Sequence, residues 1–243
     1  MKRRNPNSQA GFSLIEMLVA CALTTIIMGA IFAQIIQGQQ YSSSERTKMD
    51  LFQESRQFMY QMARDLRAAG YPNTRNFTTD PTTPAQDSPQ EAMGLVKLDV
   101  GSLWFESSID GSGNVSVIHY DLAQTGPGCP CLTRSQTPKI TADPLTGQTE
   151  SNQTQVQYVL NGSTTDPIFT AYYSDGFAAT LPIDITNSAM ANINSIAVTL
   201  KVQSPYPDPK THQLPTITLL STVKLNNCSV AYPLTSGTVM GCK

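Results

Sequence analysis

The sequence predicts an α+β fold in which one long N-terminal helix packs against an antiparallel β-sheet head. Three observations favour it. An apolar run spans residues 12–36, a helical repeat continues to residue 69, and short strand-like segments separated by turn residues follow residue 72. A helix needs roughly 20 apolar residues to cross a bilayer, and the first segment is long enough. The predicted parts are a leader (1–11), a transmembrane helix (12–36), its amphipathic continuation (37–70) and a β-rich head (71–243).

The N-terminal segment combines a short basic leader with an apolar helix that carries one acidic residue. Lys2, Arg3 and Arg4 precede the apolar run, and Glu16 is the only charge within it. Positive residues before the run and none directly after it predict a cytoplasmic N-terminus and a head on the other side of the membrane. A secretory signal would be shorter and followed by small residues. A simple signal anchor would not explain a carboxylate inside the run.

Helical periodicity continues beyond the membrane segment. Apolar and small residues recur every three or four positions, which predicts one face that packs under the head. Gly70 and Pro72 are expected to end the helix after Ala69, giving a rod of about 85 Å. The predicted packed face comprises Phe52, Ser55, Met59, Met62, Leu66 and Ala69, and charged residues fill the other faces: Glu45, Arg46, Lys48, Asp50, Glu54, Arg56, Arg64, Asp65 and Arg67.

The head is expected to form one antiparallel sheet laid across the helix, after a loop over residues 73–90. A turn-rich stretch at residues 110–114 predicts a β-hairpin. A proline-rich connection between the last two strands predicts a second hairpin with a long loop. The predicted strands are Met93 to Leu98, Ser102 to Ile109, Val115 to Leu122, Gln155 to Leu160, Ile168 to Tyr173, Ser195 to Gln203 and Thr216 to Leu225.

Composition and cysteine usage point to an exported module. Only 14% of residues are charged, and the chain beyond the leader carries 13 basic and 18 acidic residues, so it lacks the basic surface of a nucleic-acid-binding protein. Four cysteines outside the membrane segment predict two disulfides in an oxidising compartment, rather than a zinc site. A bridge across Pro130 would be strained, so Cys129 and Cys131 are each expected to reach Cys228 or Cys242.

No catalytic constellation is recognised, and we expect neither an enzyme nor a cofactor. His119 and His212 lie on different elements, so each is expected to be structural or solvated. The acidic segments 110–114 and 143–150 do not follow the spacing of an EF-hand loop, and turn chemistry explains their glycines and aspartates. We therefore expect no metal site.

The segment Gly11-Phe12-Ser13-Leu14-Ile15-Glu16, with its basic leader and apolar helix, resembles the prepilin peptidase motif of type IV pilins and type II secretion pseudopilins. The resemblance implies cleavage between Gly11 and Phe12 by prepilin peptidase and N-methylation of Phe12. Glu16 then becomes the fifth residue of the mature chain. There the resemblance implies a pair with the free amine of a neighbouring subunit, which sets the axial register during assembly.

The layout of the whole chain is similar to that of PilW-like minor pilins, which are thought to prime filament assembly at or near the tip. J-type pseudopilins share the layout, and a tip adhesin remains an alternative. The resemblance implies other pilin or pseudopilin subunits, prepilin peptidase, an inner-membrane assembly platform and membrane lipid as partners. No nucleic-acid partner is expected, because the chain beyond the leader is acidic. It also implies a single-pass precursor in the inner membrane, with the head in the periplasm, that later joins a pilus or pseudopilus.

Overall fold

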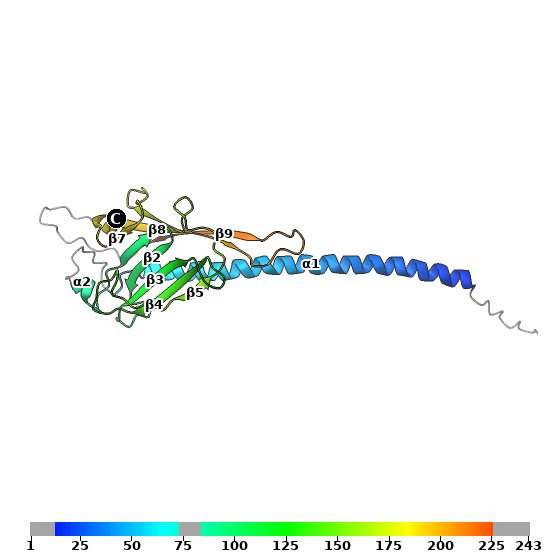
Figure 1. Ribbon diagram of the computed structural model, residues 1–243, viewed down its shortest axis with the longest axis horizontal. Helices are drawn as coiled ribbons and strands as arrows, with labels where there is room; N and C mark the ends of the chain where they lie inside the picture. The colour runs from blue at the N-terminus through cyan, green and yellow to red at the C-terminus, as the bar shows by residue number, and fades with distance from the viewer. Residues whose placement is uncertain (1–12, 73–83, 226–243) are drawn as a thin grey trace, which may run out of the picture.

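The computed structural model describes residues 13–72 and 84–225. It shows a long helix, α1, that protrudes from a β-rich head (Figure 1). The outer half of α1 stands alone, whereas its inner half lies against the head. The predicted α+β class is therefore confirmed.

Helix α1 spans Leu14–Arg67, a length of 54 residues. At about 1.5 Å per residue it is roughly 80 Å long. Ala68 caps its C-terminus, two residues before Gly70, whose φ of 90° is one that glycine adopts without steric cost. The predicted end at Ala69 is therefore two residues beyond the observed end at Arg67. The predicted start at Phe12 lies outside the described residues.

The end of α1 is attached to the head by hydrogen bonds. The Ser107 hydroxyl donates to the carbonyl of Ala68 at 2.6 Å, which satisfies one of the helix's terminal carbonyls. The Gly70 amide donates to the carbonyl of Glu106 at 2.8 Å, and the carbonyl of Tyr71 accepts from the Ser108 amide at 2.8 Å. The chain therefore leaves the helix directly onto a strand of the head.

The larger of two sheets has six antiparallel strands in the order β5-β4-β3-β2-β1-β7. Strands β2 and β3 form the hairpin predicted around residues 110–114, with Ser107 opposite Ser116. The short helix α2 (Pro84–Asp87) precedes the sheet, inside the segment predicted as a loop. The strands are β1 (Leu95–Asp99), β2 (Ser102–Ser107), β3 (Ser116–Ala123), β4 (Cys131–Pro138), β5 (Gln153–Val156) and β7 (Ile183–Asp184).

The smaller sheet has three antiparallel strands in the order β6-β8-β9. Strands β8 and β9 form the second predicted hairpin, with Gln203 opposite Thr216. Their connection, residues 204–215, extends back along α1 and is called the arm here (Figure 1). The strands are β6 (Phe169–Tyr173), β8 (Ile193–Gln203) and β9 (Thr216–Lys224), with a 3₁₀ helix at Ser188–Asn192.

The prediction of a single sheet is wrong, and so are two details of the strand list. Strands β4 and β7 were not predicted, because β4 is rich in polar residues and ends in a proline, and β7 has two residues. The strand predicted at residues 155–160 is β5 at Gln153–Val156. The chain then leaves the larger sheet, and Val159 forms a bridge to Val202 in the smaller one.

One hydrophobic core joins the helix to both sheets. From α1 it takes Met62 and Leu66, which are fully buried, and Phe58, which the predicted packed face did not include. Tyr120 of β3 meets Phe58 edge to face, with ring centroids 5.8 Å apart. The predicted packing of the helix under the head is confirmed, except that Phe52 remains 38% exposed.

A buried carboxylate lies at the centre of this helix–sheet contact. Asp65 of α1 is fully buried, so its predicted position on a charged outer face is wrong. Its Oδ2 accepts hydrogen bonds from Tyr120 Oη at 2.8 Å and from Arg134 Nε and Nη2 at 3.0 and 2.8 Å. Burial, followed by the charge of Asp65, raises the pKa of the Tyr120 phenol far above its usual range, so it remains a donor.

A second buried ion pair lies next to the end of α1. Lys139 Nζ donates to Glu106 Oε2 at 2.8 Å and to the carbonyl of Glu91 at 2.9 Å. Both charged side chains are fully buried. Burial raises the pKa of Glu106, while the Lys139 charge and hydrogen bond act in the opposite direction.

Removing the partner of Asp65 is expected to destabilise the head strongly. Arg134→Met leaves the buried carboxylate with only the exposed Arg64, whose Nη2 lies 3.6 Å from Oδ1, and is expected to lower the free energy of unfolding by about 3–5 kcal/mol. Denaturant unfolding of the full chain in detergent, followed through Trp104 as the single tryptophan, measures the change. The control is Arg46→Met, because Arg46 is an exposed basic residue of the same helix outside this contact. The double change Asp65→Leu with Arg134→Met should recover most of the loss. Equal destabilisation by Arg134→Met and by the control variant would contradict the prediction.

Candidate assembly site on the N-terminal helix

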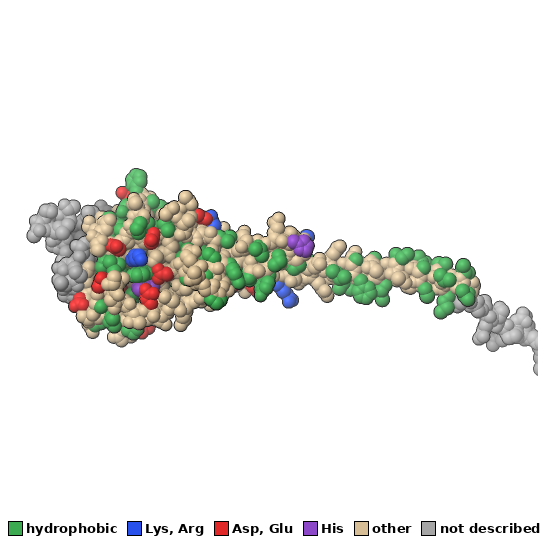
Figure 2. Space-filling model, viewed as in Figure 1, with side chains coloured by type: hydrophobic (Ala, Val, Ile, Leu, Met, Phe, Trp, Pro, Cys, Tyr) green, Lys and Arg blue, Asp and Glu red, His purple; other side chains and the backbone are tan. Residues whose placement is uncertain are grey.

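The protruding part of α1 has no cover within the described residues. Every residue from Ser13 to Ser43 is exposed, and Figure 2 shows hydrophobic side chains spread along this part of the helix. The helix contains an 18-residue window of mean hydropathy 2.2, which meets the length and composition of a membrane span. So large an apolar surface requires either lipid or other helices around it.

Glu16 lies in the first turn of α1, among exposed apolar side chains. Leu14, Ile15, Met17 and Leu18 around it are each more than 60% exposed. An acidic residue in the first turn interacts favourably with the positive end of the helix dipole. This effect offsets only part of the cost of placing a carboxylate in an apolar layer, so Glu16 still requires a cationic partner in that environment.

The other predicted processing residues, Gly11 and Phe12, lie outside the described residues. The helix is continuous through Gly29 and Gly38, where open space surrounds the position of an added Cβ. The hydroxyls of Thr24 and Thr25 donate to carbonyls one turn earlier, at 2.7–2.9 Å. These bonds satisfy both hydroxyls inside the helix, as an apolar environment demands.

The cysteine pairing differs from the prediction for two of the four residues. Cys129 and Cys131 are bonded to each other, with Sγ–Sγ 2.04 Å and Cα–Cα 4.1 Å. The Cys129 amide donates to the Gly126 carbonyl and so ends a turn, and Cys131 is the first residue of β4. The expectation that each reaches a distant cysteine is therefore wrong. Cys228 and Cys242 lie outside the described residues, and Cys21 is a free, exposed cysteine in α1.

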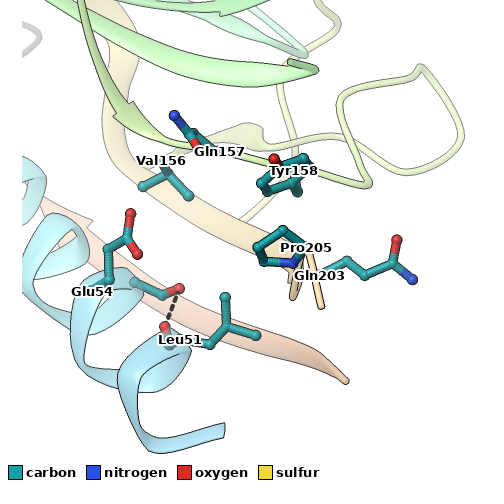
Figure 3. A pocket seen from close by; sticks show the side chains of 8 residues that line it. Leu51, Glu54, Val156, Gln157, Tyr158, Gln203 and Pro205 are labelled. Atoms are coloured by element: carbon teal, nitrogen blue, oxygen red, sulfur yellow. Dashed lines mark hydrogen bonds between the residues drawn. The ribbon is translucent and has the colours of Figure 1, made fainter. Parts of the chain in front are cut away.

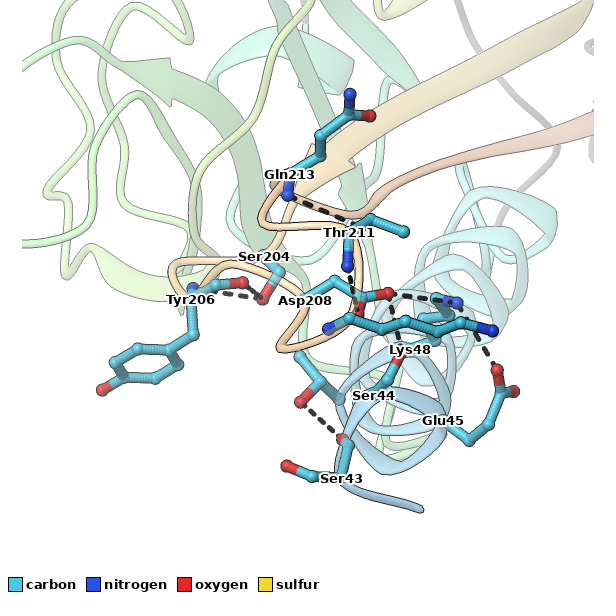
Figure 4. A network of polar contacts seen from close by, with 11 residues as sticks. Ser43, Ser44, Glu45, Lys48, Ser204, Tyr206, Asp208, Thr211 and Gln213 are labelled. Carbon is cyan, nitrogen blue, oxygen red and sulfur yellow. Dashed lines mark hydrogen bonds and ion pairs between the residues drawn. The ribbon is translucent and has the colours of Figure 1, made fainter. Parts of the chain in front are cut away.

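The arm holds α1 at a point just beyond the apolar segment. Asp208 of the arm accepts a hydrogen bond from the Ser44 hydroxyl at 2.6 Å, and Lys48 Nζ lies 3.4 Å from the same carboxylate oxygen (Figure 4). Lys210 Nζ lies 4.7 Å from the centre of the Tyr41 ring, a cation–π distance. The arm thus reaches to within one to two turns of the end of the apolar run at Ile36.

The arm also presents Asp208 in a fixed orientation. Its other carboxylate oxygen accepts from the backbone amides of Lys210 at 2.8 Å and Thr211 at 3.3 Å. The hydrogen bond from Ser44, followed by the one from the Lys210 amide, lowers the pKa of Asp208 far below its usual range. The carboxylate therefore stays ionised at all pH values at which a carboxyl group usually titrates. Sequence analysis did not identify this contact, because it joins residues 164 positions apart.

A small cleft lies between α1 and the head, next to the start of the arm. Leu51, Glu54, Tyr158 and Pro205 are among its lining residues (Figure 3). The Ser55 hydroxyl beside it donates to the carbonyl of Leu51 at 2.7 Å and so points along the helix. A volume of about 70 Å³ fits a few water molecules and excludes an organic cofactor.

The outer face of the larger sheet carries a stacked Trp104–His119 pair. The ring centroids are 4.1 Å apart at an interplanar angle of 11°. Trp104 Nε1 donates to the carboxylate of Asp121 at 2.9 Å, and Lys97 Nζ lies 4.3 Å from the Trp104 ring centre. His119 Nδ1 is 3.2 Å from Glu150 Oε1. These contacts account for His119 as a structural residue, as predicted.

Within the described residues, no group of three or more His, Cys, Asp or Glu side chains is arranged to hold a metal ion. The acidic segments considered for calcium form turns. Asp110 accepts from the Ser112 amide at 3.0 Å, and Asp143 accepts from the Leu145 amide at 2.9 Å. Turn chemistry therefore accounts for both, and the protruding helix is the best candidate for the functional site.

Comparison with known proteins adds one match. Residues 6–32 match the family model described as the prokaryotic N-terminal methylation motif. The matched segment contains the first part of the exposed helix and Glu16. No curated protein and no solved structure matches the chain.

The Asp208 contact predicts a local effect of one substitution. Asp208→Ala removes the acceptor for Ser44 and for two amides of the arm, so the arm should detach from α1 while the core is retained. Hydrogen exchange of the full chain in detergent should become faster in residues 204–215 and 41–48. Ser43→Ala is the matched control, because Ser43 is exposed and adjacent to Ser44. Exchange that is equal in the two variants would show that Asp208 does not hold the arm.

The buried His119 predicts a pH dependence. Burial lowers its pKa below the usual value of 6.5, against the opposing charges of Asp121 and Glu150. Below about pH 6.5 the unfolded chain takes up a proton that the folded chain does not. Stability from this residue is therefore complete above that pH and falls as the pH drops toward the pKa in the folded state.

Urea midpoints between pH 8 and 5.5 measure the effect. His119→Phe keeps a ring beside Trp104 and should reduce the acid-induced loss of stability. His212→Phe, at an exposed position, should leave it unchanged. A pH profile that is the same for wild type and His119→Phe would refute the assignment.

Proposed function

We propose that this chain, a type IV pilin-like protein by its N-terminal methylation motif and its long apolar helix, is a PilW-like minor pilin that takes part in priming pilus assembly or lies at the pilus tip. One observation carries the proposal. An ionisable residue, Glu16, lies in the part of α1 in which every described residue, from Ser13 to Ser43, is exposed. Such a helix is suited to lipid before assembly and to a bundle of like helices afterwards.

Processing prepares the helix for that bundle. Prepilin peptidase would cut between Gly11 and Phe12, which removes Lys2, Arg3 and Arg4 and creates a new amine at Phe12. The precursor would stay in the inner membrane with its head in the periplasm, and an assembly platform would move it into the filament. The exposed apolar surface of α1 supports lipid as its surroundings before assembly.

Glu16 provides the register in this proposal. A carboxylate in an apolar bundle costs several kcal/mol unless a cation neutralises it. The amine of Phe12 on a neighbouring subunit is close to the same depth, four positions away along the chain. The attraction is satisfied at one axial offset between two parallel helices, so the pair selects that offset.

The methylation motif is common to pilins and pseudopilins, so a J-type pseudopilin is the second candidate. The same helix and the same Glu16 pairing would operate in a secretion pseudopilus. A tip adhesin would use the same anchor, with its head as the binding part. Within the described residues no metal-binding cluster favours an enzymatic role, and a structural subunit fits the exposed helix best.

Neutralising Glu16 should block assembly without blocking processing. Glu16→Ala and the isosteric Glu16→Gln are each expected to reduce incorporation into filaments at least about tenfold, since 1.4 kcal/mol already gives that factor. Immunoblots of sheared filament fractions against membrane fractions measure the ratio. Asp50→Ala, an exposed acid on the same helix, is the control.

Mass spectrometry of the same samples separates assembly from processing. In every variant the mature chain should begin at Phe12 with one added methyl group. Normal incorporation of Glu16→Gln would disprove the register role. A chain that keeps residues 1–11 in cells with active prepilin peptidase would disprove the assignment as a pilin.

A further inference from the structure

Strand β9 is an edge strand whose inner face is incompletely covered. It has nine residues and, among residues 13–72 and 84–225, pairs with β8 alone. The inward side chains of β8, such as Val198 and Leu200, are fully buried, whereas Ile217 and Leu219 on β9 are partly exposed. Burial therefore decreases across the sheet toward β9. A long open edge of this kind is suited to accept another strand.

A groove lies between this edge strand and α1. Its volume is about 290 Å³, and it combines exposed apolar and basic side chains. Leu220 is 72% exposed and Tyr60 is 62% exposed. Arg56 donates to the Tyr60 hydroxyl at 2.9 Å and lies over the Tyr60 ring. The lining residues are Phe52, Arg56, Met59, Tyr60, Ala63, Arg67, Leu219, Leu220 and Ser221.

The chemistry of the groove defines what would fit it. The open edge of β9 offers backbone donors and acceptors to an extended segment, and the apolar side chains offer a surface for alternate residues. Arg56 and Arg67 are exposed cations, and within the described residues no carboxylate is recorded as an ion-pair partner of either. The groove is therefore complementary to an extended strand that carries apolar and acidic side chains.

The groove and Glu16 lie on the same side of α1. Glu16 and Phe52 are 36 positions apart. At about 3.6 residues per turn this is about ten whole turns, so both side chains project in nearly the same direction. Arg56 and Tyr60 follow Phe52 on the same stripe. A subunit that pairs with Glu16 therefore lies on the side where the groove opens.

A second copy that pairs through the same edge does not fit this arrangement. Two β9 strands related by a two-fold axis would run antiparallel. Strand β9 runs lengthwise alongside α1, so the two helices would then point in opposite directions (Figure 1). Helices anchored in one membrane with the same topology must point in the same direction. The partner therefore presents a different surface.

We propose that the groove between β9 and α1 is a docking site for an extended acidic segment in the head of a neighbouring pilin-like subunit. This inference rests on the proposed function, because it requires a neighbour at Glu16. The segment adds to the open edge of β9, and its carboxylates meet Arg56 and Arg67. The contact would extend the helix bundle into the heads and select which subunit lies next.

Photo-cross-linking in cells tests the docking site. Benzoylphenylalanine replaces Leu220 in one full-length variant and Ile27 in another. The Ile27 probe reports the helix bundle of the proposed function, and the Leu220 probe reports the groove. Arg56→Glu should reduce cross-linking from position 220 at least about tenfold and leave cross-linking from position 27 unchanged. Arg46→Glu, an exposed basic residue outside the groove, is the matched control.

The cross-linked partner is identified by mass spectrometry. Support requires that the partner at position 220 carries its own N-terminal methylation motif and that Arg56→Glu alone reduces the product. A product within the chain's own residues 226–243, or with β9 of a second copy, would overturn the inference. Cross-links from position 27 without any from position 220 would overturn the inference and retain the proposed function. Loss of both would overturn both.

Discussion

The structure depends on the burial of Asp65 at the contact between the helix and the larger sheet. A buried carboxylate is tolerated only where donors surround it, and Tyr120 and Arg134 supply three hydrogen bonds to one oxygen. These donors come from β3 and β4, so the bond geometry fixes the rotation of α1 and its position along the sheet. A purely apolar contact would tolerate sliding by a turn more easily. The polar contact thus determines which faces of α1 remain outside.

The rotation of α1 in the head also determines the orientation of its apolar N-terminal part. Because α1 is continuous from Leu14 to Arg67, fixing its inner half also fixes the direction in which Glu16 points. The arm adds a second attachment at Ser44 and Lys48, close to where the apolar run ends. The free part of the helix is therefore the part that has to enter lipid or a bundle. In the proposed function, a rigid link of this kind would transmit the axial register of the helices to the heads.

The N-terminal part of this description could be predicted from sequence because its signals are local. The apolar run is contiguous and includes Glu16 in the first turn of α1, and strand alternation located most strands. Asp65 was assigned to an outer face because it is charged, although it follows Met62 by three positions on the buried face. The partition into two sheets and the Asp208 contact depend on residues that the tertiary fold brings together, so no local sequence pattern predicts them. The Cys129–Cys131 bond is local, and it was missed because a bridge across Pro130 was expected to be strained.

Asp65 and Glu16, near the two ends of α1, are carboxylates that differ in the source of their cationic partner. At Asp65 the carboxylate obtains its cation from the same chain, so folding alone satisfies it. At Glu16 the surrounding turns of the described helix offer no basic side chain, and in the proposed function the cation is the amine of a neighbouring subunit. The buried Asp65 is thus satisfied within the chain, whereas the exposed Glu16 has no cation within the described residues. In the proposed function, this asymmetry allows the head to fold before assembly and leaves Glu16 available for an intermolecular contact.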